Sequence, residues 1–335
     1  MKLKSFVLLV GIVLFALFNF TLGTADISYD KILNFFTGTL SHTDVAFTVL
    51  RDLRLPRVLA AIASGMTLSI AGLLMQTYFR NPLAGPYVLG ITSGASLGVA
   101  FFIIASNFIG YYLSGSLLVI GVSGFAFIGT LVFMFIIYLV SLTLQQSVTV
   151  LIAGILLGTF ANAMVTFLQN IANGLQLQTF VYWNMGSLNN TNLYYSLSIL
   201  LIGLFSLIFL LFNSRQFDLW LIGEEQSQSS GLSKKTFTWV VFGITSLLTG
   251  LTTAYFGPIA FVGLISPHIA RILFKTQLHS QLFLYTAFIG IFLMLLSDSL
   301  LQLFFFAQLP LNTITSLLSL PILALLFLKK KELWM

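Results

Sequence analysis

The chain contains no cysteine and few charged residues. Asp, Glu, Lys and Arg together make up 7% of its 335 residues, whereas 58% are apolar and 34 are Phe. The absence of Cys excludes disulfides and thiolate metal sites. A soluble core does not need so apolar a composition, and repeated apolar runs of 18 or more residues are typical of transmembrane helices. The net charge of +6 therefore reports orientation in a membrane and not contact with nucleic acid.

Machinery for ATP hydrolysis, ion coupling and metal binding is also missing from the sequence. No G-x-x-x-x-G-K segment occurs, so any ATPase must be another polypeptide. Asp298 is the only carboxylate inside an expected span, which leaves a proton- or sodium-driven transporter few ion sites. Three dispersed His residues make a membrane-bound enzyme a poor alternative. His268 has no Cys, Asp or Glu near it, so we expect a structural hydrogen bond there, and neither a metal site nor a cofactor.

The apolar runs predict a single all-α polytopic membrane domain over residues 1–335. About ten spans are expected, at 5–23, 57–78, 88–107, 116–139, 149–170, 193–213, 237–256, 258–274, 281–305 and 311–328.

Two of these spans are ambiguous. The first resembles a signal peptide cleaved near Gly23, but its length and bulky residues favour a retained helix. The eighth is short and is broken by Gly257, Pro258, Gly263 and Pro267. Broken backbone at membrane depth is tolerated only where protein or a water-filled path surrounds it. Gly257, Pro258 and Gly263 are therefore candidates for the lining of a path.

The basic residues predict that both termini are cytoplasmic. With the N-terminus inside, the inner side receives eleven of them: Lys2, Lys4, Arg80, Arg215, Lys234, Lys235, Arg271, Lys275, Lys329, Lys330 and Lys331. The outer side receives the other four: Lys31, Arg51, Arg54 and Arg57.

Three of the four outer basic residues lie within the stretch VLRDLRLPR, at positions 51, 54 and 57. These arginines could anchor to lipid headgroups, or pair only with Asp44 and Asp52 nearby. They could also form a face that recognises an acidic partner, because Arg stays charged and offers a planar fork to carboxylates. We favour the third interpretation.

Glycines recur every four residues in the stretch RNPLAGPYVLGITSGASLG. Gly90, Gly94 and Gly98 fall on one helix face and allow another backbone to approach closely. The pattern fits plain helix packing or the shaping of a translocation path. Gly154 and Gly158 repeat it in the fifth span, where a subunit interface is an equal candidate.

The segment at about 214–236 is the longest inner loop. Glu224 and Glu225 suit the first turn of a helix, where the dipole favours acids, and Gly231 suits a helix stop. We predict one or two short helices on the cytoplasmic surface. Leu219 and Gly223 lie beside them, and an apolar patch next to a capped polar helix favours a docking surface over an idle connector.

Asp298 needs a partner, because an unpaired buried carboxylate costs several kcal/mol. Arg57 is the expected partner in an intramembrane ion pair. A hydrogen bond to backbone at a helix break is the alternative.

Six segments occur in an order that resembles a known family. They are LRLPRVLAA, GLLMQTYFRNPLAGPYVLGITSGASLG, WNMGSL, LIGEEQSQSSGL, GPIAFVGLISPHIARIL and SDSLLQLFFFAQLPLNTITSLLSLPI. Together they resemble the FecCD-type permease family of binding-protein-dependent ABC importers, which take up ferric siderophores, cobalamin or haem. The resemblance runs over essentially the whole chain.

This resemblance implies the type II ABC importer architecture in the plasma membrane of a bacterium. It implies a second permease subunit in a homodimer or heterodimer, a cytoplasmic ATPase dimer and an extracytoplasmic substrate-binding protein. A ferric siderophore is the expected cargo, with cobalamin or haem as alternatives.

The resemblance also assigns roles to single residues. The loop around Gly223 and Glu224 matches the coupling helices, which fit into the ATPase. Arg54 and Arg57 match outer basic residues that meet glutamates of the binding protein. Gln146 and Ser147 match the region of the inner gate. In two departures, Gln302 stands where the family often has Arg, and Gln308 where it often has Glu.

Overall fold

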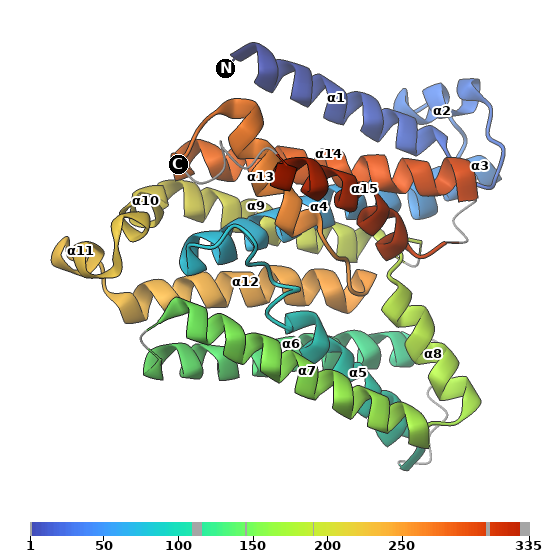
Figure 1. Cartoon of the computed structure of the whole chain (residues 1–335). Helices are drawn as coiled ribbons and strands as arrows, with labels where there is room; N and C mark the ends of the chain where they lie inside the picture. The colour runs from blue at the N-terminus through green and yellow to red at the C-terminus, as the bar shows by residue number, and fades with distance from the viewer. Residues whose placement is uncertain (1, 109–115, 145, 190, 306–308, 329–335) are drawn as a thin grey trace.

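The computed structural model describes residues 2–108, 116–144, 146–189, 191–305 and 309–328 (Figure 1). Within these ranges the chain is helical and contains no strand. The helices are α1 (Lys2–Thr21), α2 (Tyr29–Phe36), α3 (Val45–Thr48), the π-helix η1 (Val49–Arg54), α4 (Leu55–Phe79), α5 (Ile91–Phe108), α6 (Ser116–Thr143), α7 (Ser147–Ile171), α8 (Gly174–Met185), α9 (Leu193–Phe212), α10 (Ser214–Ile222), α11 (Glu224–Ser229), α12 (Lys234–Phe256), α13 (Val262–Phe274), α14 (His279–Phe305) and α15 (Leu311–Leu328).

Among the described residues, seven helical segments are long and apolar enough to cross a membrane. They are α1, the continuous segment Val45–Phe79 that ends in α4, α6, α7, α9, α12 and α14. Three shorter apolar helices, α5, α13 and α15, fall in the other three expected spans. The all-α membrane class is therefore confirmed, and the count of about ten spans stays a prediction.

Helix α4 lies at the centre of the bundle and is buried along almost its whole length. Pro56 stands in its first turn, directly after the π-helix η1, and its ring fixes φ near the helical value. Small residues then let neighbouring backbones approach. A Cβ added at Gly65 would collide with the carbonyl of Gly290 in α14, and one at Gly72 with that of Gly263 in α13. In lipid such close van der Waals packing drives helix association.

Several hydroxyl side chains inside this centre have hydrogen-bond partners on neighbouring helices. Thr67 and Thr252 approach to 2.8 Å between α4 and α12, and Ser69 donates to Ser266 of α13 at 3.0 Å. Thr67 also donates to a carbonyl four residues earlier in its own helix. Because these groups find partners inside the bundle, an apolar helix can carry them without a large penalty.

The bundle has two distinct ends (Figure 1). Helices α10 and α11 lie at one end, where Lys4 of α1 donates to the Leu273 carbonyl of α13 at 2.8 Å. Helices α2 and α3 lie at the opposite end, near Asn19 of α1 and Asp298 of α14. The first corresponds to the predicted cytoplasmic side and is called the inner end below; the second is called the outer end.

Candidate functional site

The three arginines at the outer end occupy different environments. Arg54, only 6% exposed, donates from Nη1 to the carbonyls of Phe20 and Thr21 at 3.2 and 2.9 Å. Its Nη2 donates to the Ala25 carbonyl at 2.6 Å. The last carbonyls of a helix have no intrahelical partner, so a guanidinium is well placed there. Arg54 therefore ties the end of α1 to the segment leading into α4.

Arg57 pairs with Asp298, the fully buried carboxylate of α14. Its Nε lies 3.1 Å from Oδ1 and 2.9 Å from Oδ2, and its Nη2 lies 2.7 Å from Oδ1. Asn19 of α1 and Gln302 of α14 also donate to Oδ2, at 2.8 and 2.9 Å. A bidentate guanidinium with two amide donors satisfies a buried carboxylate well. Helices α1, α4 and α14 thus meet at one ion pair.

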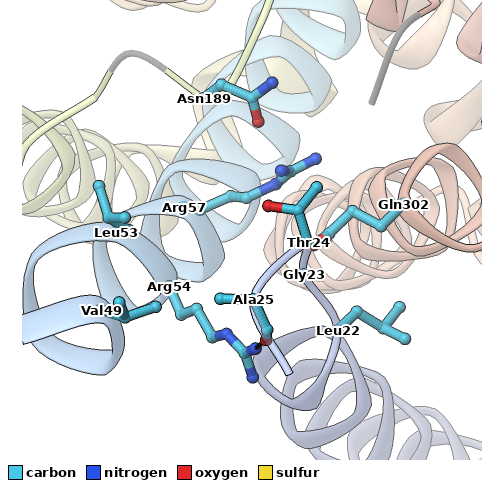
Figure 2. Close-up of a pocket in the computed structure, with 10 residues that line it drawn as sticks. All are labelled: Leu22, Gly23, Thr24, Ala25, Val49, Leu53, Arg54, Arg57, Asn189 and Gln302. Carbon is cyan, nitrogen blue, oxygen red and sulfur yellow. Dashed lines mark hydrogen bonds between the residues drawn. The ribbon is translucent and has the colours of Figure 1, made fainter. Parts of the chain in front are cut away.

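A pocket of about 330 Å³ opens beside these groups (Figure 2). It is lined by Leu22, Gly23, Thr24, Ala25, Val49, Leu53, Arg54, Arg57, Asn189 and Gln302. Arg51 lies outside this lining, on η1. Its side chain is 59% exposed and approaches Asp52 only to 3.8 Å. The outer end thus combines one accessible guanidinium with a pocket edged by two others.

At the inner end, residues 214–229 form two short helices joined at Gly223. Gly223 has φ 152° and Gly231, two residues after α11, has φ 89°, values that L side chains rarely adopt. Glu224 and Glu225 lie in the first turn of α11. Glu224 also forms an ion pair with Lys234 at 2.5 Å, which joins α11 to the start of α12.

One side of α10 is packed against the bundle, and the other side is exposed. Trp220 is buried, donates from Nε1 to the Tyr78 carbonyl at 3.0 Å and stacks on Phe237. Leu219 is half-buried, whereas Leu221 and Ile222 are exposed. An apolar edge next to Gly223 therefore faces away from the bundle.

Asp218 of α10 contacts the start of α14. Its Oδ1 lies 2.7 Å from His279 Nδ1 and accepts from the His279 backbone N–H at 3.0 Å. Burial raises the pKa of Asp218, but the hydrogen bonds from His279 outweigh it and hold the pKa below its usual range.

The glycines predicted to shape a path all make close contacts inside this chain. Gly90, at φ 74°, packs against Gly158 and Gly154 of α7. Gly94 and Gly98 pack against Gly129 of α6.

The segment from Gly257 to the first turn of α13 is also tightly packed. Gly257, at φ 74°, follows α12 and lies against Gly186 and the Trp183 carbonyl. The Pro258 carbonyl also lies near Gly186. Gly263 packs on α4 at the Leu68 carbonyl.

The remaining sequence-derived candidates are placed as follows. Gln146 is exposed and precedes α7, whereas the side chain of Ser147 and the residue Gln308 lie outside what the structure describes. His268 Nε2 lies 2.8 Å from the Pro82 carbonyl. No group of three or more His, Asp or Glu side chains that could hold a metal occurs among the described residues.

Sequence reasoning missed Asn19, Asp218 and His279. A lone Asn inside an apolar run was a usable signal, because polar groups in spans are costly unless they are paired. Asp218 and His279 carried no such signal, since their contact joins residues 61 positions apart.

Replacing Arg57 with Ala is expected to lower the free energy of unfolding by about 3–5 kcal/mol, because it leaves a buried carboxylate without its cation. Exchanging both partners, Arg57→Met with Asp298→Leu, removes the charges together and is expected to recover most of that loss. Thermal unfolding in detergent measures both variants. Wild-type stability in R57A would contradict the structural importance of the pair.

The family comparison covers nearly the whole chain: the FecCD transport family model matches residues 9–329. The hemin transport system permease protein HmuU of Yersinia pestis is 32% identical, over 97% of this chain and 95% of that protein. The vitamin B12 import system permease protein BtuC of Vibrio vulnificus is 31% identical, over 85% and 84%. The molybdate import system permease protein MolB of Haemophilus influenzae is 30% identical, over 85% and 82%.

A solved structure extends this similarity to the fold. It is an inward-facing conformation of a protein assigned to the metal-chelate type of ABC transporter. The two chains share 26% identity with a TM-score of 0.83, over 98% of this chain and 99% of the other. Family match, relatives and fold agree, and the chain belongs to the FecCD transport family as a permease subunit of an ABC importer.

Proposed function

We propose that this permease carries a bulky iron chelate inward across the plasma membrane, with a ferric siderophore as its cargo. The observation that carries the proposal is the pairing of two ends in one FecCD-family chain: a pocket edged by arginines at the outer end and an exposed coupling segment at the inner end. A chelate can pass without specific ligands in the permease, because its binding protein selects it. Haem is the second candidate, favoured by the similarity to HmuU over 97% of the chain.

The proposed assembly contains two copies of this chain, a separate ATPase dimer and an extracytoplasmic binding protein. Both termini lie on the cytoplasmic side. The basic residues at the inner end, among them Arg80, Lys234 and Lys275, support this orientation. The cargo would descend between the two permease copies.

The proposed docking surface for the binding protein consists of Arg51, Arg54 and Arg57. Arg51 makes the first contact because its guanidinium is accessible. Arg54 and Arg57 edge the pocket, where an acidic side chain of the partner could reach them. In a dimer this surface appears on both sides of the entrance.

The proposed ATPase contact consists of Leu219, Gly223, Glu224, Glu225 and Gly231. Gly223 and Gly231 supply the two sharp turns that set α11 at an angle to α10 and α12. Leu219 supports the apolar edge of α10. Glu224 links α11 to α12 through Lys234, so displacement of α11 would reach a spanning helix.

The proposed path and gate use residues at helix ends and at close contacts between helices. Gln146 and Ser147 at the start of α7 would form the inner gate. Gly90, Gly94, Gly98, Gly257, Pro258 and Gly263 would set the shape of the path through the close helix contacts that they permit.

Reconstitution of the permease with its ATPase and binding protein in liposomes tests the cargo. We expect ATP-dependent uptake of a ferric siderophore and little uptake of hemin or cyanocobalamin. Hemin uptake alone would identify haem as the cargo. No uptake of any of the three with an active ATPase would overturn the iron-chelate proposal.

Arg51→Glu is expected to lower the affinity for the binding protein by about three- to tenfold at low salt, because an exposed attractive contact becomes repulsive. The difference should narrow at about 0.5 M salt, where the Debye length is only a few ångströms. Surface plasmon resonance on the permease in nanodiscs measures both. Arg51→Lys keeps the charge and is the matched control. An unchanged, salt-independent affinity in R51E would remove Arg51 from the docking surface.

Gly231→Val is expected to weaken coupling while leaving membrane insertion normal. A β-branched residue at φ 89° is strained by about 1–3 kcal/mol, so the end of α11 should shift. Binding-protein-stimulated ATP hydrolysis and cargo uptake should both fall. Gly231→Asn, which tolerates positive φ better, should fall less. Full stimulation and uptake in G231V would show that this turn does not carry the coupling.

A further inference from the structure

We propose that Asp218, His279 and Thr77 form a three-residue link that holds α10 in register with α14 and α4, so that displacement of α10 moves these two helices as one unit. The inference rests on the proposed function, since it takes α10 as part of the ATPase contact. It assigns a positioning role to three residues that lie outside the docking, coupling and path residues named above.

The contacts of the link join three elements that are far apart in the sequence. Asp218 Oδ1 lies 2.7 Å from His279 Nδ1, and His279 Nε2 lies 2.8 Å from Thr77 Oγ1. The carboxylate can only accept, so Nδ1 carries the hydrogen in the neutral ring. Nε2 then accepts, and the Thr77 hydroxyl donates to it. Each polar atom of the ring has one partner and a fixed role.

The surroundings of the ring hold it in place. His279 is fully buried, and its ring contacts Phe217 of α10 and Phe283 of α14 at centroid distances of 5.7 and 5.5 Å. The His279 backbone N–H donates to the same Asp218 oxygen at 3.0 Å, which fixes the first residue of α14 as well as its side chain. A chain of hydrogen bonds with a buried histidine at its centre, both of whose ring nitrogens have partners, resists distortion.

A second attachment lies one residue further along α4. Trp220 of α10 donates to the Tyr78 carbonyl at 3.0 Å, and its ring stacks on the Tyr78 ring at 5.5 Å. Asp218 and Trp220 therefore connect α10 to the last turn of α4 at two adjacent residues, Thr77 and Tyr78. Two contacts side by side oppose rotation of α10 as well as translation.

Beyond the link, α4 and α14 are joined along their length. Gly65 and Gly290 bring the two backbones together in the middle, and Arg57 and Asp298 pair at the outer end. Sliding of α4 along α14 would break the link at the inner end, the glycine contact in the middle and the ion pair at the outer end. A displacement imposed on α10 is therefore transmitted by α4 and α14 toward the outer pocket, whose lining includes Arg57 and Gln302.

The experiment compares Thr77→Val with Thr77→Ser in the full complex of permease, ATPase and binding protein in nanodiscs. Valine matches the shape of threonine but removes the hydroxyl, whereas serine keeps it. Three quantities are measured: the basal rate of ATP hydrolysis, the rate stimulated by loaded binding protein, and the amount of cargo transported per ATP in liposomes. Thermal unfolding is recorded in parallel.

We expect T77V to keep its basal hydrolysis and to lose about three- to tenfold in stimulation and in cargo per ATP, the effect of one hydrogen bond on an equilibrium. T77S should match the wild type in all three quantities. A purely structural role would instead lower the unfolding temperature and reduce basal and stimulated hydrolysis in parallel, which would overturn the proposal. Equal stimulation in T77V, T77S and the wild type would also overturn it.

Asp218→Ala gives a second variant that is independent of core packing, because the Asp218 side chain is 33% exposed. It is expected to show the same split between basal and stimulated hydrolysis, and it replaces T77V should that variant fail to assemble. The double variant T77V/D218A should lose no more stimulation than the more impaired single variant, because both substitutions act through His279. Additive losses would contradict a single link. A wild-type complex without any stimulation would reject the proposed function and not the link.

Discussion

The buried carboxylate of Asp298 is the constraint on which the outer half of the bundle depends. A charge in an apolar interior is tolerated only with a partner of opposite charge and with its remaining lone pairs satisfied. Arg57, Asn19 and Gln302 meet that requirement from α4, α1 and α14. Because three helices contribute, the ion pair fixes their relative depth. Arg54, one turn earlier, fastens the end of α1 to the same place.

The three arginines of the stretch VLRDLRLPR therefore have different roles. Their even spacing in the sequence resembles a uniform basic face, but their contacts and exposure differ in the structure. Arg54 and Arg57 hold helices together and present only part of their guanidinium groups to the pocket. Arg51 remains accessible. The proposed docking contact and the internal cohesion therefore share one short segment, so substitutions there are expected to affect both unless they are confined to Arg51.

Contacts between distant helices also secure the inner end. Trp220 and Asp218 secure one side of α10, while Leu221 and Ile222 stay exposed on the other. This combination of an attached side and an exposed side suits the proposed contact of α10 with the ATPase. Gly223 and Gly231 supply the turns that separate α11 from its neighbours. Since α4 and α14 run between the two ends and contact each other at both, the bundle itself provides the connection.

The sequence by itself determined the membrane class, the order of the apolar helices, the short helices after residue 213 and the family resemblance, because composition, periodicity and turn residues act locally. It also suggested Arg57 for Asp298, since few charges were available for pairing. Tertiary structure alone decided that Arg54 caps α1, that Asn19 joins the ion pair, and that His279 links Asp218 to Thr77. These contacts depend on where helices distant in the sequence cross each other, and local sequence patterns do not predict those crossing points.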